Sequence, residues 1–417
     1  MENESKPPVK TSEIMDSLTK SLKSSFLVEW YSTMTGFLSG SKSFYVLLGI
    51  GVIIVYAGSL GALDAVRIGY LNAYGVSREV PWGILISTYI FFVVTSTGLC
   101  IVSSIGHVFG VKNFMPIAKR AVFLSIVTIV AGFTVILFEI ENPFRMALYN
   151  VISPGLTSNI WWMGTLYGAY MFFMIVEFIF LLLDNHKFAT YFGLAGLISG
   201  VSAHSNLGAI FGMLHAREYW YGPFLPVYFI ASAIMSGCAT IIFFTWLGYK
   251  ITNEKMDRPM LRSMEAISKL LMLMIVVTLF LVAWKILTGL VGGPDKIEAL
   301  TAMMSGSYAF NFWVIEILMG LIIPFVILLT SKGKNINIAF LASAMMIFAI
   351  FFMRYDLLVI GELVPVYHDL GVKEYPGLLS YTPSFHEILI VLAGMGLTAT
   401  TFMMGEKVFR GHKSEIH

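Results

Sequence analysis

The chain has 417 residues, of which 57% are hydrophobic and only 12% are charged. Soluble proteins carry about 25% charged residues, so this composition excludes a water-soluble domain as the main part of the chain. The formal net charge of +2 is too small to indicate a nucleic-acid partner, and we expect none.

Ten runs of predominantly apolar residues have the length of a transmembrane helix, which takes about 20 residues. They lie at 44–66, 83–109, 117–138, 160–183, 188–213, 224–249, 266–291, 311–330, 336–360 and 385–404. The chain is therefore predicted to be an all-α membrane protein with ten transmembrane helices, numbered here as spans 1 to 10. The membrane domain (44–405) lies between an N-terminal tail (1–43) and a C-terminal tail (406–417). Within the first tail, residues 13–38 could form an amphipathic helix on the membrane surface.

The positive charges gather on one side of the predicted membrane. Both tails and the loops near 112–120, 187, 250–269 and 332–334 together carry 19 of the 27 lysines and arginines. Positively charged loops stay on the cytoplasmic side. We therefore expect both termini in the cytoplasm, and the loops near 141–158 and 366–384 in the periplasm.

Spans 2 and 6 share a residue pattern, and so do spans 4 and 8. Trp82-Gly83, Tyr89 and Gly98 match Tyr221-Gly222, Tyr228 and Gly237 at one constant offset, and Asn159-Ile160-Trp161 matches Asn311-Phe312-Trp313. The pattern predicts two repeated four-helix bundles, spans 2–5 and spans 6–9, flanked by spans 1 and 10. Chance similarity is the alternative, because aromatic residues and glycines are common in membrane helices.

Most ionisable residues of the spans lie toward the predicted periplasmic face. A charge in hydrocarbon is costly, so each such residue is a candidate functional group. The candidates are Asp64 and Arg67 in span 1, Glu139 and Arg145 after span 3, and His204 in span 5, with Arg217, Glu218, Lys285, Glu316, Arg354 and Asp356 in the second half. A histidine with a carboxylate could hydrogen-bond a quinone carbonyl and exchange its proton. The alternative for each residue is an interfacial anchor or a structural ion pair.

Three further ionisable residues lie toward the cytoplasm. They are His107 at the end of span 2, and Glu177 and Asp184 in span 4. Glu177 and Asp184 are seven residues apart, and therefore on nearly one face of a helix. The three could carry protons from the cytoplasm to the outer site. Alternatively, His107 and Asp184 lie among lipid headgroups, and Glu177 is a neutral group bonded to a neighbouring helix.

Resident redox cofactors are not expected. A b-type haem needs two histidines at matching depth, but the two clearly within spans, His107 and His204, lie at opposite ends. An iron–sulfur cluster needs about four ligands, and the only cysteines are Cys100 and Cys238. We expect no metal site, so any electrons must come from a partner subunit.

Three segments of the chain resemble the NrfD/PsrC family. They are Tyr74-Gly75-Val76-Ser77-Arg78-Glu79-Val80-Pro81-Trp82-Gly83, which is similar to the family's opening G-x-x-x-x-V-x-W-G; His204-Ser205-Asn206-Leu207-Gly208-Ala209-Ile210-Phe211 with Tyr219-Trp220-Tyr221-Gly222-Pro223; and Arg354-Tyr355 with Gly361 and Pro365. The resemblance covers about residues 44–405. The family supplies the quinone-binding membrane subunit of respiratory complexes, and the ten-span layout looks most like the subunits of menaquinone reductase Qrc and alternative complex III.

The resemblance implies a quinone/quinol oxidoreductase subunit in the cytoplasmic (inner) membrane of a bacterium or archaeon. Its substrate would be menaquinone or another quinone, and its partners a periplasmic iron–sulfur (ferredoxin-like) subunit with a molybdopterin-type or multihaem cytochrome c subunit. The quinone would bind near the periplasmic face, at His204, Tyr89, Glu139, Asp64, Arg67 and Arg145. The individual ligands stay open, because the site residues vary within the family.

Two other functions stay open on the sequence alone. A secondary transporter also has internal repeats and intramembrane carboxylates, but it usually binds its substrate near the midplane, at broken helices. Here most polar residues lie outward of the midplane. A structural anchor for a soluble complex is the third candidate, and it would not need buried charges.

Overall fold

The computed structural model describes residues 42–366 and 377–409. Within these ranges ten helices are long and apolar enough to cross a membrane, which confirms the predicted number. The same ranges contain no strand, as expected for an all-α membrane protein. The predicted surface helix at 13–38 and most of both tails lie outside the described residues.

The spans begin and end close to their predicted limits. They are α2 (Lys42–Ile68), α4 (Ile84–His107), η1 (Lys112–Ile117) continued by α5 (Ala118–Glu139), α7 (Asn159–Leu182), α8 (His186–Gly212), α9 (Phe224–Thr252), α10 (Arg258–Leu290), η2 (Asn311–Ile322) continued by α12 (Ile323–Thr330), α13 (Ile336–Leu363) and α14 (Phe385–Phe409). The largest difference is at α10, which begins at Arg258 and not at 266. Its first turns carry charged residues that a hydropathy count excludes, while Asp257 caps the helix by accepting a bond from the Met260 N–H at 2.9 Å.

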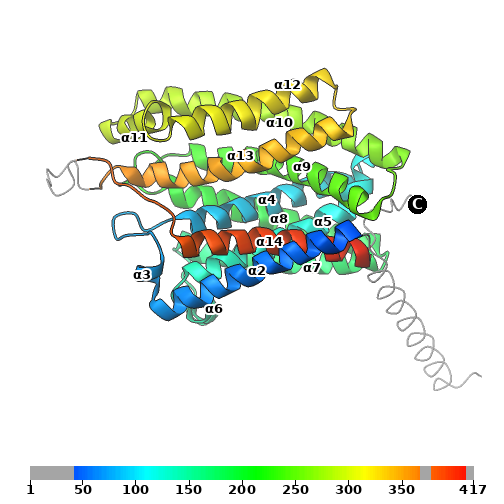
Figure 1. Cartoon of the computed structure of the whole chain (residues 1–417), viewed down its shortest axis with the longest axis horizontal. Helices are drawn as coiled ribbons and strands as arrows, with labels where there is room; N and C mark the ends of the chain where they lie inside the picture. The colour runs from blue at the N-terminus through cyan, green and yellow to red at the C-terminus, as the bar shows by residue number, and fades with distance from the viewer. Residues whose placement is uncertain (1–41, 367–376, 410–417) are drawn as a thin grey trace, which may run out of the picture.

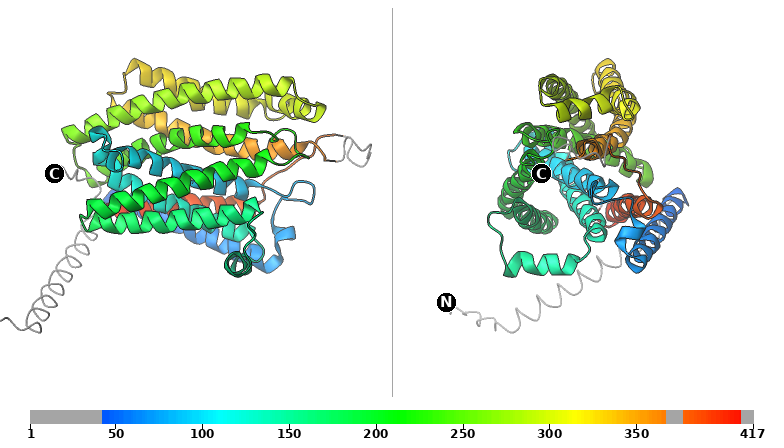
Figure 2. Two further views of the ribbon diagram at one scale, coloured as in Figure 1. Left: turned by 180° about the vertical axis from the view of Figure 1, so that it is seen from behind. Right: turned by 90° about the vertical axis from the view of Figure 1, so that its left-hand side faces the viewer.

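Three short helices lie at one end of the molecule, at the left of Figure 1. They are α3 (Tyr70–Ala73), α6 (Pro143–Ile152) and α11 (Pro294–Met304). The end-on view in Figure 2 shows α6 lying across the direction of the spans. We call this end of the molecule the α6 end. The first span begins, and the last span finishes, at the opposite end.

The helices α4 and α9 lie at the centre of the molecule. Their most apolar stretches are 89% and 72% buried, the highest shares among the spans. Gly98 of α4 and Gly237 of α9 pack against each other, and a methyl group on either would overlap the backbone of the other helix. Small residues permit such close approach between membrane helices. The two glycines thus set the crossing around which the other spans are arranged.

The remaining spans form two groups around this crossing. In one group α4, α5, α7 and α8 pack on one another, and in the other α9, α10, η2 with α12, and α13 do the same. The spans α2 and α14 pack side by side (Figure 1), and α14 also packs against α5. This grouping matches the predicted assignment of spans 2–5 and 6–9. The internal repeat itself stays a prediction, because packing alone does not show that the groups are copies.

Several residues matched in the predicted repeat have matching environments. Gly98 and Gly237 meet each other directly. The Nε1–H of Trp161 donates to the backbone oxygen of Asn150 in α6 at 2.7 Å, and that of Trp313 donates to the backbone oxygen of Met304 in α11 at 2.9 Å. Each tryptophan therefore fixes a short helix to its own group of spans at the α6 end.

Candidate functional site

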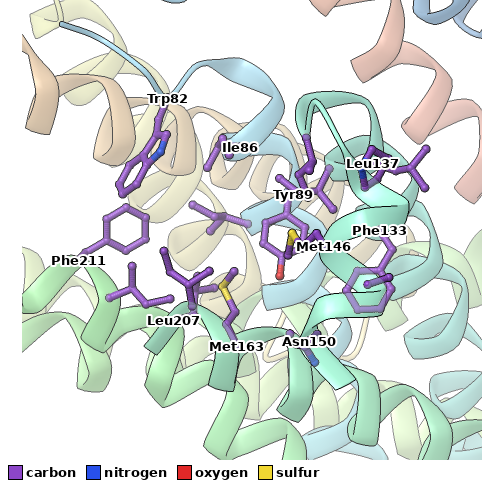
Figure 3. A pocket seen from close by; sticks show the side chains of 18 residues that line it. Trp82, Ile86, Tyr89, Phe133, Leu137, Met146, Asn150, Met163, Leu207 and Phe211 are labelled. Atoms are coloured by element: carbon purple, nitrogen blue, oxygen red, sulfur yellow. The ribbon is translucent and has the colours of Figure 1, made fainter. Parts of the chain in front are cut away.

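A cavity of about 490 Å³ lies at the α6 end, within the first group of spans. Residues of α4, α5, α6, α7 and α8 line it, and most of them are aliphatic or aromatic, including Ile86, Leu137, Met146, Met163, Leu207 and Phe211 (Figure 3). Pockets of this size and character enclose small organic ligands, and the few polar groups set the ligand's orientation.

Two polar side chains face this apolar space, Tyr89 of α4 and Asn150 of α6. Figure 3 shows the hydroxyl oxygen of Tyr89 pointing into the cavity, toward Met163 and Asn150. The amide nitrogen of Asn150 donates to the Thr165 hydroxyl at 3.1 Å, which fixes its side chain. A flat ring in the cavity would therefore meet apolar walls and one hydroxyl able to bond a carbonyl oxygen.

His204 lies behind this hydroxyl, not on the cavity wall. The Tyr89 ring packs edge-on against the Tyr167 ring at 6.5 Å between centroids, and the Tyr167 hydroxyl lies 3.2 Å from His204 Nδ1. His204 Nε2 lies 3.0 Å from the Phe229 carbonyl oxygen, which can only accept a hydrogen bond. Nε2 therefore carries the proton, and Nδ1 of the neutral ring accepts from Tyr167. His204 is fully buried, so it acts on a cavity ligand only through Tyr167 and Tyr89.

The loop before α4, residues 74–83, contributes Trp82 to the cavity wall. The Glu387 carboxylate accepts the Gly75 N–H at 2.8 Å and the Tyr381 hydroxyl at 2.6 Å. The Glu362 carboxylate accepts the Trp82 N–H at 3.3 Å. Burial, and then the adjacent Glu387 carboxylate, raise the pKa of Tyr381, so this hydroxyl stays protonated and donates.

These contacts hold Trp82 in the cavity wall. Its ring stacks on Trp220 at 5.7 Å and meets Phe211 edge-on at 5.6 Å. The Arg217 guanidinium donates to the backbone oxygens of Glu79 and Glu362 at 3.0 and 2.9 Å, which ties the loop 74–83 to the end of α13. Glu362, Tyr381 and Glu387 were not predicted from the sequence, because their contacts with this loop come from distant segments of the chain.

The other outer residues predicted for the site do not line the cavity. Asp64 is exposed and lies 3.0 Å from His386 Nε2. Arg67 is exposed at the end of α2, and Arg145 lies over the Tyr149 ring of its own helix at 5.3 Å. Glu139 is half-buried, next to the cavity-lining residue Ile140. Of the six predicted quinone residues, only Tyr89 faces the cavity directly.

Two of the inner residues meet at the opposite end of the first group. His107 Nε2 lies 2.5 Å from Glu177 Oε1, and both side chains are buried. His107 Nδ1 lies 3.0 Å from the Ser103 carbonyl oxygen and must carry a hydrogen. A proton is therefore shared between His107 Nε2 and Glu177. A Cβ at Gly193 would lie 2.6 Å from His107 Nε2, so the absence of a side chain makes room for the pair.

Asp184 does not join this pair. The helix α7 ends at Leu182, so the helical spacing that placed Asp184 on the face of Glu177 does not continue to it. Asp184 has a φ of 53° and is exposed in the turn before α8. The Asp184 side chain therefore lies outside the buried His107–Glu177 pair.

Buried hydroxyl groups lie between the inner pair and the cavity. The Tyr170 hydroxyl donates to the Ser96 backbone oxygen at 3.0 Å and lies 2.9 Å from the Ser96 hydroxyl. The Tyr170 ring meets the Tyr167 ring edge-on at 6.5 Å. Tyr167, Tyr170 and Glu177 share one face of α7 and are fully buried. Neither tyrosine was predicted from the sequence, although their spacing from Glu177 was a usable signal.

Comparison with known proteins agrees with this arrangement. The family model described as "Polysulphide reductase, NrfD" matches residues 73–366. The chain belongs to the NrfD family. The matched region contains the loop 74–83, the cavity and the buried row of NrfD-family spans, whereas α2 and α14 lie outside it.

Similar NrfD-type chains cover most of the sequence. A selenate reductase subunit of Mesobacillus selenatarsenatis is 25% identical over 88% of this chain and 96% of its own length. The Hdr-like menaquinol oxidoreductase integral membrane subunit of Archaeoglobus fulgidus is 26% identical, over 86% of this chain and 92% of its own. A putative dimethyl sulfoxide reductase membrane subunit of Halobacterium salinarum is 25% identical, over 79% and 83%. All three names describe subunits of oxidoreductase complexes.

Proposed function

We propose that this chain is the quinone-binding membrane subunit of a respiratory oxidoreductase complex. The cavity at the α6 end carries the proposal, because its apolar walls suit a quinone ring and Tyr89 offers a hydrogen bond to a carbonyl oxygen. The name of the Archaeoglobus relative, a menaquinol oxidoreductase subunit, supports the same substrate class. Family membership favours this function over the secondary transporter.

The chemistry divides between this chain and its partners. Oxidation of a quinol releases two electrons and two protons, and reduction of a quinone takes up the same number. In the proposal, the electrons pass to or from a periplasmic iron–sulfur partner at the α6 end. The chain itself orients the ring and moves protons. Tyr89 bonds the quinone oxygen, while Tyr167 and His204 form the hydrogen-bonded pair behind it.

A proton route to the opposite end forms the second part of the proposal. It begins at the His107–Glu177 pair, passes the hydroxyl groups of Tyr170 and Ser96, and reaches Tyr167 beside Tyr89. The positive charges of the tails and loops favour a cytoplasmic location for the end where this route begins. Uptake of protons there during quinone reduction at the other end would move charge across the membrane.

The substitution Tyr89→Phe tests the site in the intact complex. It keeps the ring and removes only the hydroxyl that faces the cavity. The loss of one neutral hydrogen bond costs about 0.5–1.5 kcal/mol, which corresponds to a roughly two- to tenfold rise in the quinone KM. The control is Tyr191→Phe, since Tyr191 is 60% exposed on α8 and lies outside the cavity. Equal quinone kinetics of both variants and the unmodified complex would refute this site.

A further inference from the structure

A second set of ionisable side chains lies at the α6 end, within the other group of spans. The Lys285 ammonium of α10 donates to the Tyr219 hydroxyl at 2.5 Å. The amide nitrogen of Asn311 donates to Asp356 Oδ1 of α13 at 3.2 Å. The carboxyl groups of Glu316 and Asp356 lie close enough to interact directly, with Lys285 within electrostatic reach of both. The proposed function uses none of these groups.

Burial makes this set chemically unusual. Asp356 is 1% exposed, and its Oδ2 has no hydrogen-bond partner among the described residues. Lys285, Glu316 and Asp356 line an enclosed space of about 10 Å³. Two adjacent carboxylates in such surroundings repel each other, and the pair lowers its energy by holding a proton. One lysine beside them offsets a single negative charge.

The acid pair lies in the second group of spans at the position that the predicted repeat matches to the cavity of the first group. Tyr228 matches Tyr89 in the predicted repeat, and it lines the small space as Tyr89 lines the cavity. Phe312 and Ile160 are likewise matched residues that line the two spaces. The second group of spans therefore has acidic and basic side chains where the first group has room for a ring.

A hydrogen-bonded chain joins the second group of spans to His204. The Arg354 guanidinium of α13 donates to the Ser232 hydroxyl at 2.7 Å, and Ser232 donates to the Phe229 carbonyl oxygen at 3.0 Å. His204 Nε2 donates to the same oxygen. Arg354 is fully buried, and its positive charge interacts with the Glu316 carboxyl group. A change of charge on the acid pair is therefore transmitted over a short distance to the proton-bearing groups behind the cavity.

The backbone under Glu316 is also unusual. The segment η2, Asn311–Ile322, is a π-helix, and it supplies both Asn311 and Glu316 to the cluster. Helices of this type often occur at functional sites. A continuous α-helix would rotate these side chains to other positions.

We propose that Glu316 and Asp356 form a proton-binding site that gains one proton and releases it again in each turnover of the quinone cavity. The ligand is the proton alone, which converts one carboxylate of the pair to a carboxylic acid and back. Lys285 offsets the charge of the carboxylate that stays ionised. The inference rests on the proposed quinone function, since turnover in the first group of spans supplies the driving force.

Two phenols near the acid pair keep their protons at neutral pH and are not the proton-exchanging groups. The ionisable groups within electrostatic reach of the pair are Lys285 of α10, Arg354 and Tyr355 of α13, Tyr228 of α9, and two tyrosines in loops, Tyr219 and Tyr308. Lys296 of α11 acts on Lys285. Burial, followed by the nearby carboxylates of Glu316 and Asp356, raises the pKa of Tyr219. Burial and Asp356 raise the pKa of Tyr308 to about 12. Both phenols therefore keep their protons at neutral pH.

Infrared difference spectroscopy of the membrane complex, recorded between oxidised and reduced quinone, tests the proposal. A protonated carboxyl group has its own stretching band, and we expect one that changes with quinone redox state and shifts in heavy water. The band should be lost in Glu316→Gln or in Asp356→Asn. The control is Glu265→Gln, because Glu265 forms only an exposed pair with Lys269 at 2.8 Å on α10, and its spectrum should equal that of the unmodified complex.

Several results would overturn the inference. The inference fails if the unmodified complex shows no carboxyl band that changes with quinone redox state. It also fails if this band persists in both Glu316→Gln and Asp356→Asn. If neither variant assembles, the wild-type spectrum still decides, with Glu177→Gln used to identify any band that belongs to the inner pair. If Tyr89→Phe and its control behave alike, the proposed quinone site itself fails. If Tyr89→Phe is impaired as expected but no such band exists, only the second site fails.

Discussion

His107 Nε2 lies 2.5 Å from Glu177 Oε1, and this contact joins α4 to α7 in the interior of the first group of spans. The two groups share a proton, because His107 Nδ1 already donates to the Ser103 carbonyl oxygen. Glu177 Oε2 is buried and has no hydrogen-bond partner in the described part of the chain. A buried, proton-sharing pair at the beginning of a row of hydroxyls is suited to proton transfer.

The substitution Glu177→Gln should stop this transfer while the fold is kept. Glutamine retains the size and hydrogen-bonding capacity of the side chain but cannot carry a proton. We expect the variant complex to assemble, and to lose turnover or charge movement in proteoliposomes. The control is Asp184→Asn, which should change little, because Asp184 is exposed and asparagine tolerates its positive φ. Unchanged electron transfer and unchanged membrane potential in Glu177→Gln would make Glu177 a packing residue only.

The substitution Gly193→Ala tests whether the geometry of the pair matters. The added methyl group would lie 2.6 Å from His107 Nε2 and 3.0 Å from Glu177 Oε1, so it must separate the pair. We expect reduced turnover, and a loss of stability of about 1–3 kcal/mol from overpacking. The matched control is Gly168→Ala on α7, where a methyl group meets no atom within 4 Å. Thermal unfolding in detergent and turnover should be measured for both variants. Equal stability and equal turnover would show that the spacing of His107 and Glu177 is not critical.

His204 should be needed for quinone chemistry although it does not touch the cavity. His204→Ala removes the partner of the Tyr167 hydroxyl, so we expect most quinone-linked electron transfer to be lost in a complex that still assembles. Tyr167→Phe should reproduce part of this loss, because it breaks the same bond and keeps the ring. Normal turnover of His204→Ala would reduce His204 to a satisfied core histidine.

The orientation in the membrane can be tested by labelling with an impermeant thiol reagent. Cys100 and Cys238 are both buried, so the unmodified chain should give little background. A cysteine at Ser153, after α6, should react from the periplasmic side, whereas a cysteine at Lys334, between α12 and α13, should not. Both positions are exposed. The reverse pattern would move the cavity and the proposed iron–sulfur partner to the cytoplasmic side.

The sequence predicted the spans well because each one is a long apolar run, and the fold needs little else to place them in a membrane. The sequence also placed Tyr89 toward one end of the spans, and His107 and Glu177 toward the other. It could not predict the cavity, because α6 forms part of the wall and its short, mixed sequence carries no span signal. It mistook Asp184 for a member of the helix face of Glu177, because the end of α7 at Leu182 is set by the turn into α8.

The hydrogen-bond partners of buried side chains could not be predicted from the sequence either. His204 bonds Tyr167 and the Phe229 carbonyl, which come from other helices, and not the serine and asparagine beside it in the sequence. Glu387 and Tyr381 lie about 300 residues along the chain from Gly75 and Ile84, to which they hydrogen-bond. Contacts between distant segments depend on the arrangement of helices, which composition and spacing do not determine.

Photolabelling of the purified complex with a light-activated quinone tests the central claim most directly. The label should attach to residues that line the cavity, such as Met146 and Met163, and excess unmodified menaquinone should displace it. Labelling should also decrease in Tyr89→Phe but not in Tyr191→Phe. Label that attaches to α10 or α13 instead, or that menaquinone does not displace, would contradict the assignment of this cavity as the quinone site.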